Sequence, residues 1–235
     1  MLEIKNIYKT FNPGTINEKV ALNGLSLKLN EGDFVTVIGG NGAGKSTMLN
    51  AVAGVWPVDE GQIIIDGTDV TKLSEYKRAA YLGRVFQDPM TGTAATMGIE
   101  ENLALAKRRG KTRLLRPGIT KAERAEYKEL LKILNLGLED RLTSKVGLLS
   151  GGQRQALTLL MATLQKPKLL LLDEHTAALD PKTAAKVLDI TDKIVNRDHL
   201  TTLMITHNMK DAIAHGNRLI MMMNGKIVLD IQGEE

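Results

Sequence analysis

The sequence predicts an α/β fold built around a mostly parallel sheet, and three apolar runs carry this prediction. Residues 34–38 read Phe-Val-Thr-Val-Ile, residues 169–172 are all leucine, and residues 203–205 read Leu-Met-Ile. Such runs are typical of strands covered on both faces. Each run ends at glycines or polar residues. Because ligands of open α/β sheets bind beyond the carboxyl ends of the strands, we expect the functional residues there.

The two ends of the chain predict antiparallel strands. Residues 2–5 and 25–29 alternate apolar and polar side chains, which indicates strands with one exposed face. Residues 219–223 and 226–229 flank Asn224-Gly225, and this arrangement is typical of a β-hairpin. We therefore expect an antiparallel β-subdomain at the start of the chain and a hairpin near its end.

The middle of the chain predicts a helical insertion. Between about 88 and 164 strand patterns fade, and residues 122–134 and 153–164 have helical composition and spacing. We expect residues 1–235 to form a single domain, with a catalytic core over about 1–87 and 165–235 and the helical insertion between them.

Composition excludes several classes of function. The chain has 235 residues and no cysteine, which excludes disulfide frameworks, zinc fingers, iron–sulfur clusters and thiol nucleophiles. The formal net charge of +4 decides nothing about partners. Only 3% of the residues are aromatic, which argues against a single-stranded nucleic-acid partner, because such binding needs stacking platforms. No apolar run of about 18 residues is present. We expect a cytoplasmic protein that does not itself span a membrane.

A phosphate-binding loop follows the first apolar run. Residues 39–47 match G-x-x-x-x-G-K followed by serine or threonine, and they open a helix that ends at Gly54. Glycines let backbone N–H groups point at phosphate oxygens, and the helix adds its positive end. Lys45 would neutralise β- and γ-phosphate charge, and the Ser46 hydroxyl would bind Mg²⁺. The residues expected to hold the nucleotide are Gly39, Gly40, Asn41, Gly42, Ala43, Gly44, Lys45, Ser46 and Thr47.

Asp173 and Glu174 supply the carboxylates that phosphoryl transfer needs. Asp173 is the candidate Mg²⁺ ligand, and Glu174 is the candidate general base that orients or deprotonates the attacking water. Taken alone, the pair would be better explained as an acidic turn after a strand. Because the same chain also has the phosphate loop, we favour the catalytic interpretation. The chain has no Asn-Lys-x-Asp element of the kind that guanine-specific enzymes carry, so ATP is the expected nucleotide.

The segment Leu149-Ser150-Gly151-Gly152-Gln153 discriminates among ATP-binding enzymes. Taken alone, it is either a flexible turn capping a helix that starts near Gln153 or a functional loop. It lies about 20 residues before Asp173, and Ala178-Leu179-Asp180 and His207 follow. With its motifs in this order, the sequence resembles the ATP-binding cassette (ABC) ATPases, the motor subunits of ABC transporters. The resemblance covers essentially the whole chain.

The resemblance implies a fold and a role for each motif. The implied fold is a P-loop NTPase (RecA-like) core with an N-terminal antiparallel β-subdomain and an inserted α-helical subdomain. Phe11 matches the aromatic residue that stacks on adenine, with Tyr8 as a competing candidate. Gln87 matches the Q-loop glutamine, which would help Ser46 and Asp173 to hold Mg²⁺. His207 matches the switch histidine, which contacts the γ-phosphate.

The resemblance also implies an assembly. Cassettes of this family dimerise head to tail. Each ATP then lies between the Walker motifs of one copy, which match residues 39–47 and 169–174 here, and the signature motif of the other, which matches residues 149–153. The signature residues Ser150, Gly151, Gly152 and Gln153 would then bind the nucleotide of the opposite copy, whereas Glu174, His207 and Gln87 would form the catalytic set. The implied partners are a second copy, a transmembrane permease subunit and an extracytoplasmic solute-binding protein. The implied location is the cytoplasmic face of the cell membrane.

The cargo is implied by a finer resemblance. Residues 92–102, together with His175, resemble a subgroup of cassettes described as tryptophan/tyrosine uptake systems, which implies an importer of a small solute such as aromatic amino acids. Two alternatives stay open: a soluble ABC ATPase that acts as an assembly scaffold, and the cassette of an exporter or lipoprotein-release system. The partner, rather than the cassette, discriminates among them.

Three features depart from the family pattern or lie outside it. His175 stands where proline is common, and we expect it to reshape the turn. Gly40 stands where proline or serine is frequent and predicts a more permissive loop with no lost phosphate contact. The basic run 107–111, with Arg113 and Arg116 beyond it, either approaches lipid headgroups or an acidic partner loop, or is a solvated loop. We favour the solvated loop.

Overall fold

The structure is a computed structural model that describes residues 1–111 and 118–233. The chain divides into two compact units. The first, which we call the sheet unit, contains Met1–Gly83, Lys168–Glu174 and the chain from His199 onward. The second, which we call the helical unit, contains Arg84–Pro167 and His175–Asp198. The helical unit thus includes residues 175–198, which the sequence analysis assigned to the catalytic core.

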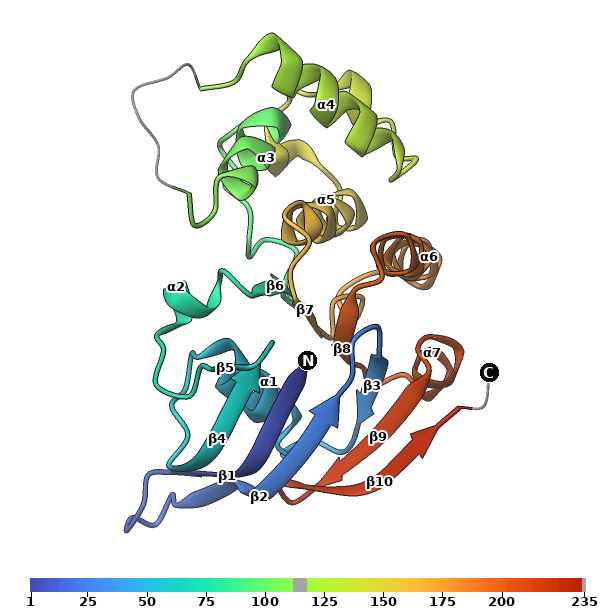
Figure 1. Ribbon diagram of the computed structural model, residues 1–235. Helices are drawn as coiled ribbons and strands as arrows, with labels where there is room; N and C mark the ends of the chain where they lie inside the picture. Colours follow the sequence, from blue (N-terminus) through green and yellow to red (C-terminus); the bar gives the residue numbers. More distant parts are fainter. Residues whose placement is uncertain (112–117, 234–235) are drawn as a thin grey trace. The chain divides into compact units, whose positions relative to one another are not determined.

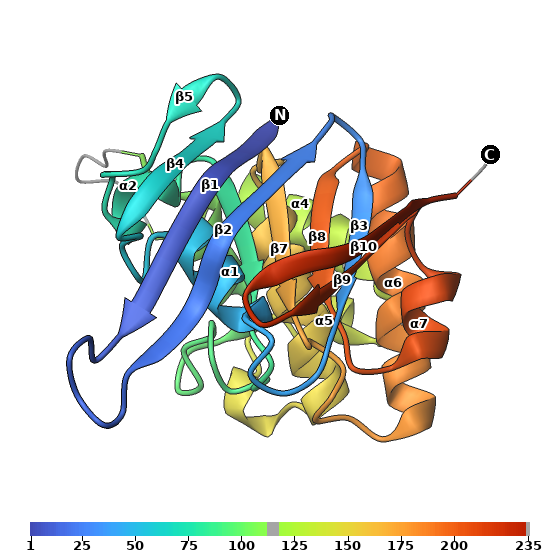
Figure 2. The same cartoon turned by 90° about the horizontal axis from the view of Figure 1, so that it is seen from below.

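A six-stranded sheet contains the three buried runs, with the order β10-β9-β3-β8-β7-β6 among the described residues (Figures 1 and 2). Strand β3 pairs in parallel with β8 and β9, and β7 pairs in parallel with β8. The predicted parallel sheet is therefore confirmed. The strands are β3 (Phe34–Ile38), β6 (Leu82–Val85), β7 (Leu169–Asp173), β8 (Thr201–Ile205), β9 (Arg218–Met223) and β10 (Lys226–Gln232).

The hairpin predicted around Asn224-Gly225 is present. Strands β9 and β10 pair antiparallel, with Lys226 opposite Met223. Asn224 and Gly225 have φ angles of 49° and 72°, so both central residues of the turn lie in the left-handed region that asparagine and glycine tolerate best.

A second, antiparallel sheet has the order β2-β1-β4-β5. Its strands are β1 (Leu2–Phe11), β2 (Lys19–Leu29), β4 (Glu60–Ile65) and β5 (Thr68–Asp69). The ladder between β1 and β2 runs from the pair Leu2 and Leu29 to the pair Phe11 and Lys19. Inward residues of both sheets join Met48, Leu49 and Val52 of helix α1 (Lys45–Ala53) in one hydrophobic core, which holds this helix in place.

A buried arginine anchors the far end of α1. Arg78 closes the short helix α2 (Glu75–Arg78), is 2% exposed, and donates hydrogen bonds of 2.7 and 3.0 Å to the carbonyl oxygens of Ala51 and Val52. It also donates to the carbonyl oxygens of Leu73 and Thr71, each at 2.9 Å. Burial lowers the pKa of Arg78. Its charge faces the negative end of α1, which fixes the helix behind the phosphate loop.

The helical unit contains the helices predicted near 122–134 and 153–164. They are α4 (Lys121–Lys132) and α5 (Gly151–Thr163), and α3 (Ile99–Lys107), α6 (Pro181–Asp198) and two short 3₁₀ turns at Leu138–Asp140 and Val146–Leu148 accompany them. The sheet unit adds the short helix α7 (Met209–Ala214). Among the described residues, no helix has the length and apolar character needed to cross a membrane.

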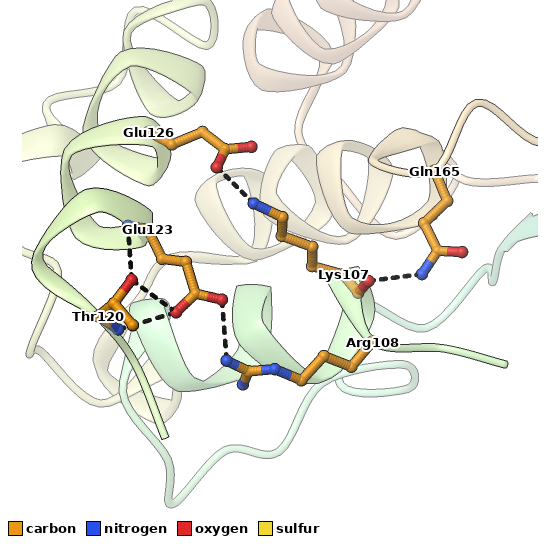
Figure 3. Close-up of polar contacts among 6 residues, drawn as sticks. All are labelled: Lys107, Arg108, Thr120, Glu123, Glu126 and Gln165. Atoms are coloured by element: carbon orange, nitrogen blue, oxygen red, sulfur yellow. Dashed lines mark hydrogen bonds and ion pairs between the residues drawn. The ribbon is translucent and has the colours of Figure 1, made fainter. Parts of the chain in front are cut away.

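Two residues of the basic run form ion pairs within the helical unit. Lys107 pairs with Glu126, and Arg108 donates to Glu123 at 2.9 Å, so both cations are neutralised by helix α4 (Figure 3). Burial lowers the pKa of Arg109. All three side chains remain partly exposed, with Lys107 and Arg108 paired to α4 and, among the described residues, no ion pair at Arg109. Arg113 and Arg116 of the same prediction lie outside the described residues.

Glu123 contacts both Arg108 and the start of α4, and these contacts predict a pH dependence. The Thr120 backbone N–H donates to the Glu123 carboxylate at 2.8 Å, which, together with Arg108, holds the pKa of Glu123 below its usual 4.5. A lowered pKa means that ionised Glu123 stabilises the fold above pH 4.5, and that this gain is lost as the pH falls through its folded-state pKa. We expect Glu123→Gln to lower Tm at pH 7 and to lower it by a smaller amount at about pH 3. Thermal melts at both pH values test this, and an equal Tm difference at both would contradict it.

Candidate active site

The phosphate loop lies between β3 and α1 and forms one wall of a pocket in the sheet unit. The lining also includes two residues from the start of β2 and two that follow β7 and β8. The lining residues are Lys19, Ala21, Asn41, Gly42, Ala43, Gly44, Lys45, Ser46, Thr47, Glu174 and His207. The carboxyl ends of three parallel strands therefore meet at one place, as the sequence predicted. Gly39 and Gly40 begin the loop, just outside this lining.

Lys45 is held in position by the loop itself. Its side-chain ammonium donates to the carbonyl oxygens of Gly39 and Gly40 at 2.8 and 3.2 Å, and the residue is 5% exposed. A lysine ammonium has three donors, so these contacts leave one for a ligand. A buried cation fixed within a glycine-rich loop that opens a helix is suited to a phosphate chain.

Gly44 and Gly40 differ in how strictly the loop needs them. Gly44 has φ of 101°, and a Cβ atom there would lie 2.5 Å from the Ala21 carbonyl oxygen, so no other residue fits without a backbone shift. At Gly40 a Cβ atom would meet nothing within 4 Å. The loop therefore accepts a side chain at Gly40, the position where the family frequently has proline or serine.

Glu174 and His207 form a hydrogen-bonded pair beside the loop. Glu174 Oε1 lies 2.6 Å from His207 Nε2, with side-chain exposures of 12% and 46%. Glu174 has φ of 47°, uncommon for a residue other than glycine, and its N–H donates to the Ile205 carbonyl oxygen at 3.0 Å. This bond to β8 holds the strained turn, and strain of this kind is concentrated at functional sites. The carboxylate lines the pocket beside the phosphate loop.

The candidate Mg²⁺ ligands are hard oxygen donors. Ser46 lies in the first turn of α1, and Asp173 is the last residue of β7, opposite Ile205 of β8. Among the described residues no cluster of three or more histidine or acidic side chains could hold a metal by itself. A hydroxyl and one carboxylate fit Mg²⁺, which keeps several waters and is bound largely through substrate phosphates. Gln87, the third candidate, is exposed and belongs to the helical unit.

Phe11 lies outside the residues that line the pocket. Its ring packs edge-on against Trp56, with centroids 5.0 Å apart, and Lys9 lies 5.7 Å from its centroid. Adenine is distant from the phosphates in a nucleotide, so this position is compatible with a base platform. Trp56 is a further aromatic candidate that the sequence analysis did not consider.

The signature residues begin α5 in the helical unit. The helix starts at Gly151, two positions before the predicted start, because Ser150 and Gln153 form a capping box. Ser150 Oγ accepts from the Gln153 N–H at 3.3 Å, and Gln153 Oε1 accepts from the Ser150 N–H at 3.2 Å. This turn is therefore ordered, and its free N–H groups are of the kind that bind anions.

Gln155 links this helix to the Q-loop, and sequence reasoning missed it. The residue is completely buried, and its side-chain amide donates to the Phe86 carbonyl oxygen at 2.8 Å. This bond fixes the peptide that precedes Gln87. A glutamine two positions after the capping box has no local signal for such a contact, because its partner is 69 residues away in sequence.

Gly152 has a packing role besides any contact with nucleotide. A Cβ atom at Gly152 would lie 2.0 Å from Thr183 Cγ2 of α6, whereas one at Gly151 would lie 3.3 Å from the flexible end of Leu179. We expect Gly152→Ala to destabilise the protein by about 1–3 kcal/mol through overpacking. Gly151→Ala is the matched control and should have a small effect.

The same clash provides a rescue test. Thr183→Ser removes the Cγ2 methyl group, so the double variant Gly152→Ala/Thr183→Ser should recover most of the lost stability in denaturant titrations. An equal loss in the single and the double variant would contradict the packing role.

His175 is a buried core histidine. It is 1% exposed, and its Nε2 lies 3.1 Å from Thr191 Oγ1 on α6, inside the helical unit. The substitution of the family's proline thus gives the helical unit an internal hydrogen bond, and the interpretation of a reshaped turn missed this contact.

A glycine-rich loop between a buried strand and a helix, with an inward lysine and a carboxylate–histidine pair at neighbouring strand ends, defines a nucleoside triphosphatase. Comparisons with known proteins identify the family of nucleoside triphosphatases to which the chain belongs. The family model described as "ABC transporter" matches residues 22–177. The chain therefore belongs to the ABC transporter family, in which it is an ATP-binding, ATP-hydrolysing subunit.

Particular relatives agree with this assignment. The chain is 48% identical over 241 residues to a tyrosine transport ATP-binding protein of Clostridioides difficile, covering 100% of this chain and 93% of the relative. It is 34% identical to a spermidine/putrescine import ATP-binding protein of Haemophilus ducreyi, covering 98% of this chain and 57% of that longer relative. A solved dimeric ATP-binding cassette, in a post-hydrolysis state with ADP and phosphate, matches all of the chain with a TM-score of 0.84 and 30% identity.

Proposed function

We propose that this chain powers the import of a small solute, of the aromatic amino acid class, through a membrane ABC permease. The observation that carries the substrate class is the 48% identity, over nearly the full length of both chains, to a protein named for tyrosine transport. Relatives named for import of polyamines, methionine and phosphonates support the direction of transport.

The proposed site residues have separate roles in ATP binding and hydrolysis. Lys45 binds the phosphate chain through its remaining donor, and the loop N–H groups surround it. Ser46, Asp173 and Gln87 are the proposed Mg²⁺ ligands, and the ion, when bound, neutralises phosphate charge. Glu174 takes a proton from the attacking water, while His207 holds that carboxylate in place and reaches the γ-phosphate. Phe11 provides the platform for adenine.

The proposed active assembly is a head-to-tail dimer. Ser150, Gly151, Gly152 and Gln153 of one copy would bind the γ-phosphate held by the other copy, at the N-terminus of α5. The solved dimeric cassettes of the same fold support this arrangement. Because hydrolysis removes the phosphate that both copies share, it would favour the open state of the dimer.

The proposed partners place the chain at a membrane. A transmembrane permease subunit would anchor it at the cytoplasmic face, and an extracytoplasmic solute-binding protein would deliver the cargo. The family and the import relatives support the permease, and the solute-binding protein follows from the proposed direction of transport.

Affinity purification of this chain from its native cells in mild detergent, with mass-spectrometric identification of the partners, tests the proposal. We expect a multi-span membrane protein and a solute-binding protein. The latter should bind tyrosine, tryptophan or phenylalanine in calorimetry, with lysine and glutamate as control ligands. Recovery of soluble partners alone would favour the scaffold ATPase, and a permease without a solute-binding protein would favour export. A solute-binding protein that prefers the control ligands would contradict the substrate class.

A further inference from the structure

A second lysine reaches the phosphate loop from a strand outside it. Lys19 is the first residue of β2 and lies opposite Phe11 in the ladder with β1. Its ammonium is 3.4 Å from the position of a Cβ atom built on Gly42, and Lys19 lines the same pocket as Lys45. The side chain therefore extends from the strand pair that holds the candidate base platform to the middle of the loop.

The charge of Lys19 has no counter-ion in this pocket. Within residues 1–111 and 118–233 it makes no ion pair and no side-chain hydrogen bond, in contrast to Lys9 and Lys28, which pair with Asp59 and Glu3. The acidic side chain of the pocket lining is Glu174, and that carboxylate is paired with His207. A pocket with an unpaired ammonium beside a glycine-rich loop that opens a helix is suited to an anion.

We propose that Lys19 is a second phosphate-binding lysine, which contacts the phosphate chain of the bound nucleotide at the end nearest the nucleoside. The second part of this inference rests on the pairing of Lys19 with Phe11 in the ladder, because the proposed reacting groups, Glu174 and His207, follow β7 and β8 instead. Lys19 would therefore bind ADP and ATP alike, as a binding residue and not as a catalytic one. The inference rests on the proposed placement of the nucleotide in this pocket.

Calorimetric titration of ADP in EDTA tests the role of Lys19 without a divalent cation. We expect Lys19→Ala to weaken ADP and ATP binding equally, by about fivefold to tenfold at about 0.02 M NaCl. At about 0.5 M NaCl the difference should fall below about twofold, because the contact is a screened charge interaction. Lys19→Arg should retain most of the affinity. Lys28→Ala, on the same strand with an exposed side chain, is the matched control and should bind as the wild type does.

The outcomes separate this inference from the proposed function. An affinity of Lys19→Ala within about twofold of wild type at low salt, or a loss that does not change with salt, would overturn the role of Lys19. Lys45→Ala is the reference for the pocket itself. If Lys45→Ala also binds ADP normally, the nucleotide does not occupy this pocket and the proposed placement fails. If only Lys45→Ala loses affinity, the pocket stands and the Lys19 contact is wrong.

Discussion

Replacing Glu174 with glutamine should lower kcat for ATP hydrolysis by about a hundredfold to ten-thousandfold and leave ATP affinity within about threefold of wild type. Glutamine has nearly the same shape and still accepts a hydrogen bond from His207, so the 2.6 Å contact and the strained turn can persist. What it cannot do is take a proton from water. A large loss in kcat with unchanged binding is the pattern of a group that acts only in the chemical step.

Steady-state phosphate release and equilibrium binding of ATP measure the two quantities separately. Glu31→Gln, an exposed glutamate in the turn before β3, is the control for charge removal and should match wild type in both. Turnover of Glu174→Gln within tenfold of wild type would show that another group activates the water. A parallel loss of ATP affinity would instead make Glu174 part of the binding surface.

Replacing Lys45 with methionine should weaken ATP and ADP binding by at least about a hundredfold, the largest effect on affinity that we expect from one side chain. The ammonium is buried and fixed by the Gly39 and Gly40 carbonyl oxygens, so its charge acts in a site with little solvent screening. Methionine keeps the apolar length of the side chain and removes the charge.

Binding of a fluorescent ADP analogue measures this loss, and a thermal melt without nucleotide verifies that the variant is folded. Lys28→Met is the control for removal of a lysine from the sheet unit. A folded Lys45→Met variant that binds nucleotide tightly would place the phosphate site elsewhere.

The part of the fold that the sequence predicted is the part determined by local pattern. Residues 34–38 and 169–172 became β3 and β7 because leucine, valine and phenylalanine runs have no polar face to expose. The helix after the phosphate loop ends at Gly54, whose φ of 84° requires glycine. The position of the functional residues at one edge of the sheet then follows from topology, because parallel strands place their carboxyl ends together.

The parts that the sequence did not predict depend on contacts between distant residues. Lys19 was not a candidate because one lysine at the start of a strand has no local signal, and only the ladder with Phe11 and the approach to Gly42 reveal its position. The roles of Gln155 and Gly152 likewise depend on their contacts with Phe86 and Thr183, which are distant in the sequence. The ion pairs of Lys107 and Arg108 were not predicted, because their acidic partners on α4 lie 19 and 15 residues further along the chain.

The association state of Glu174→Gln in saturating ATP, measured by multi-angle light scattering, tests the central claim most directly. If each site is completed by the signature residues of a second copy, this variant should be a dimer in ATP and a monomer in ADP, because only uncleaved ATP joins both copies. Adding Ser150→Arg, which fills the N-terminus of α5, should abolish the dimer and leave ATP binding to the single copy intact. A Glu174→Gln variant that binds ATP and stays monomeric would contradict the account.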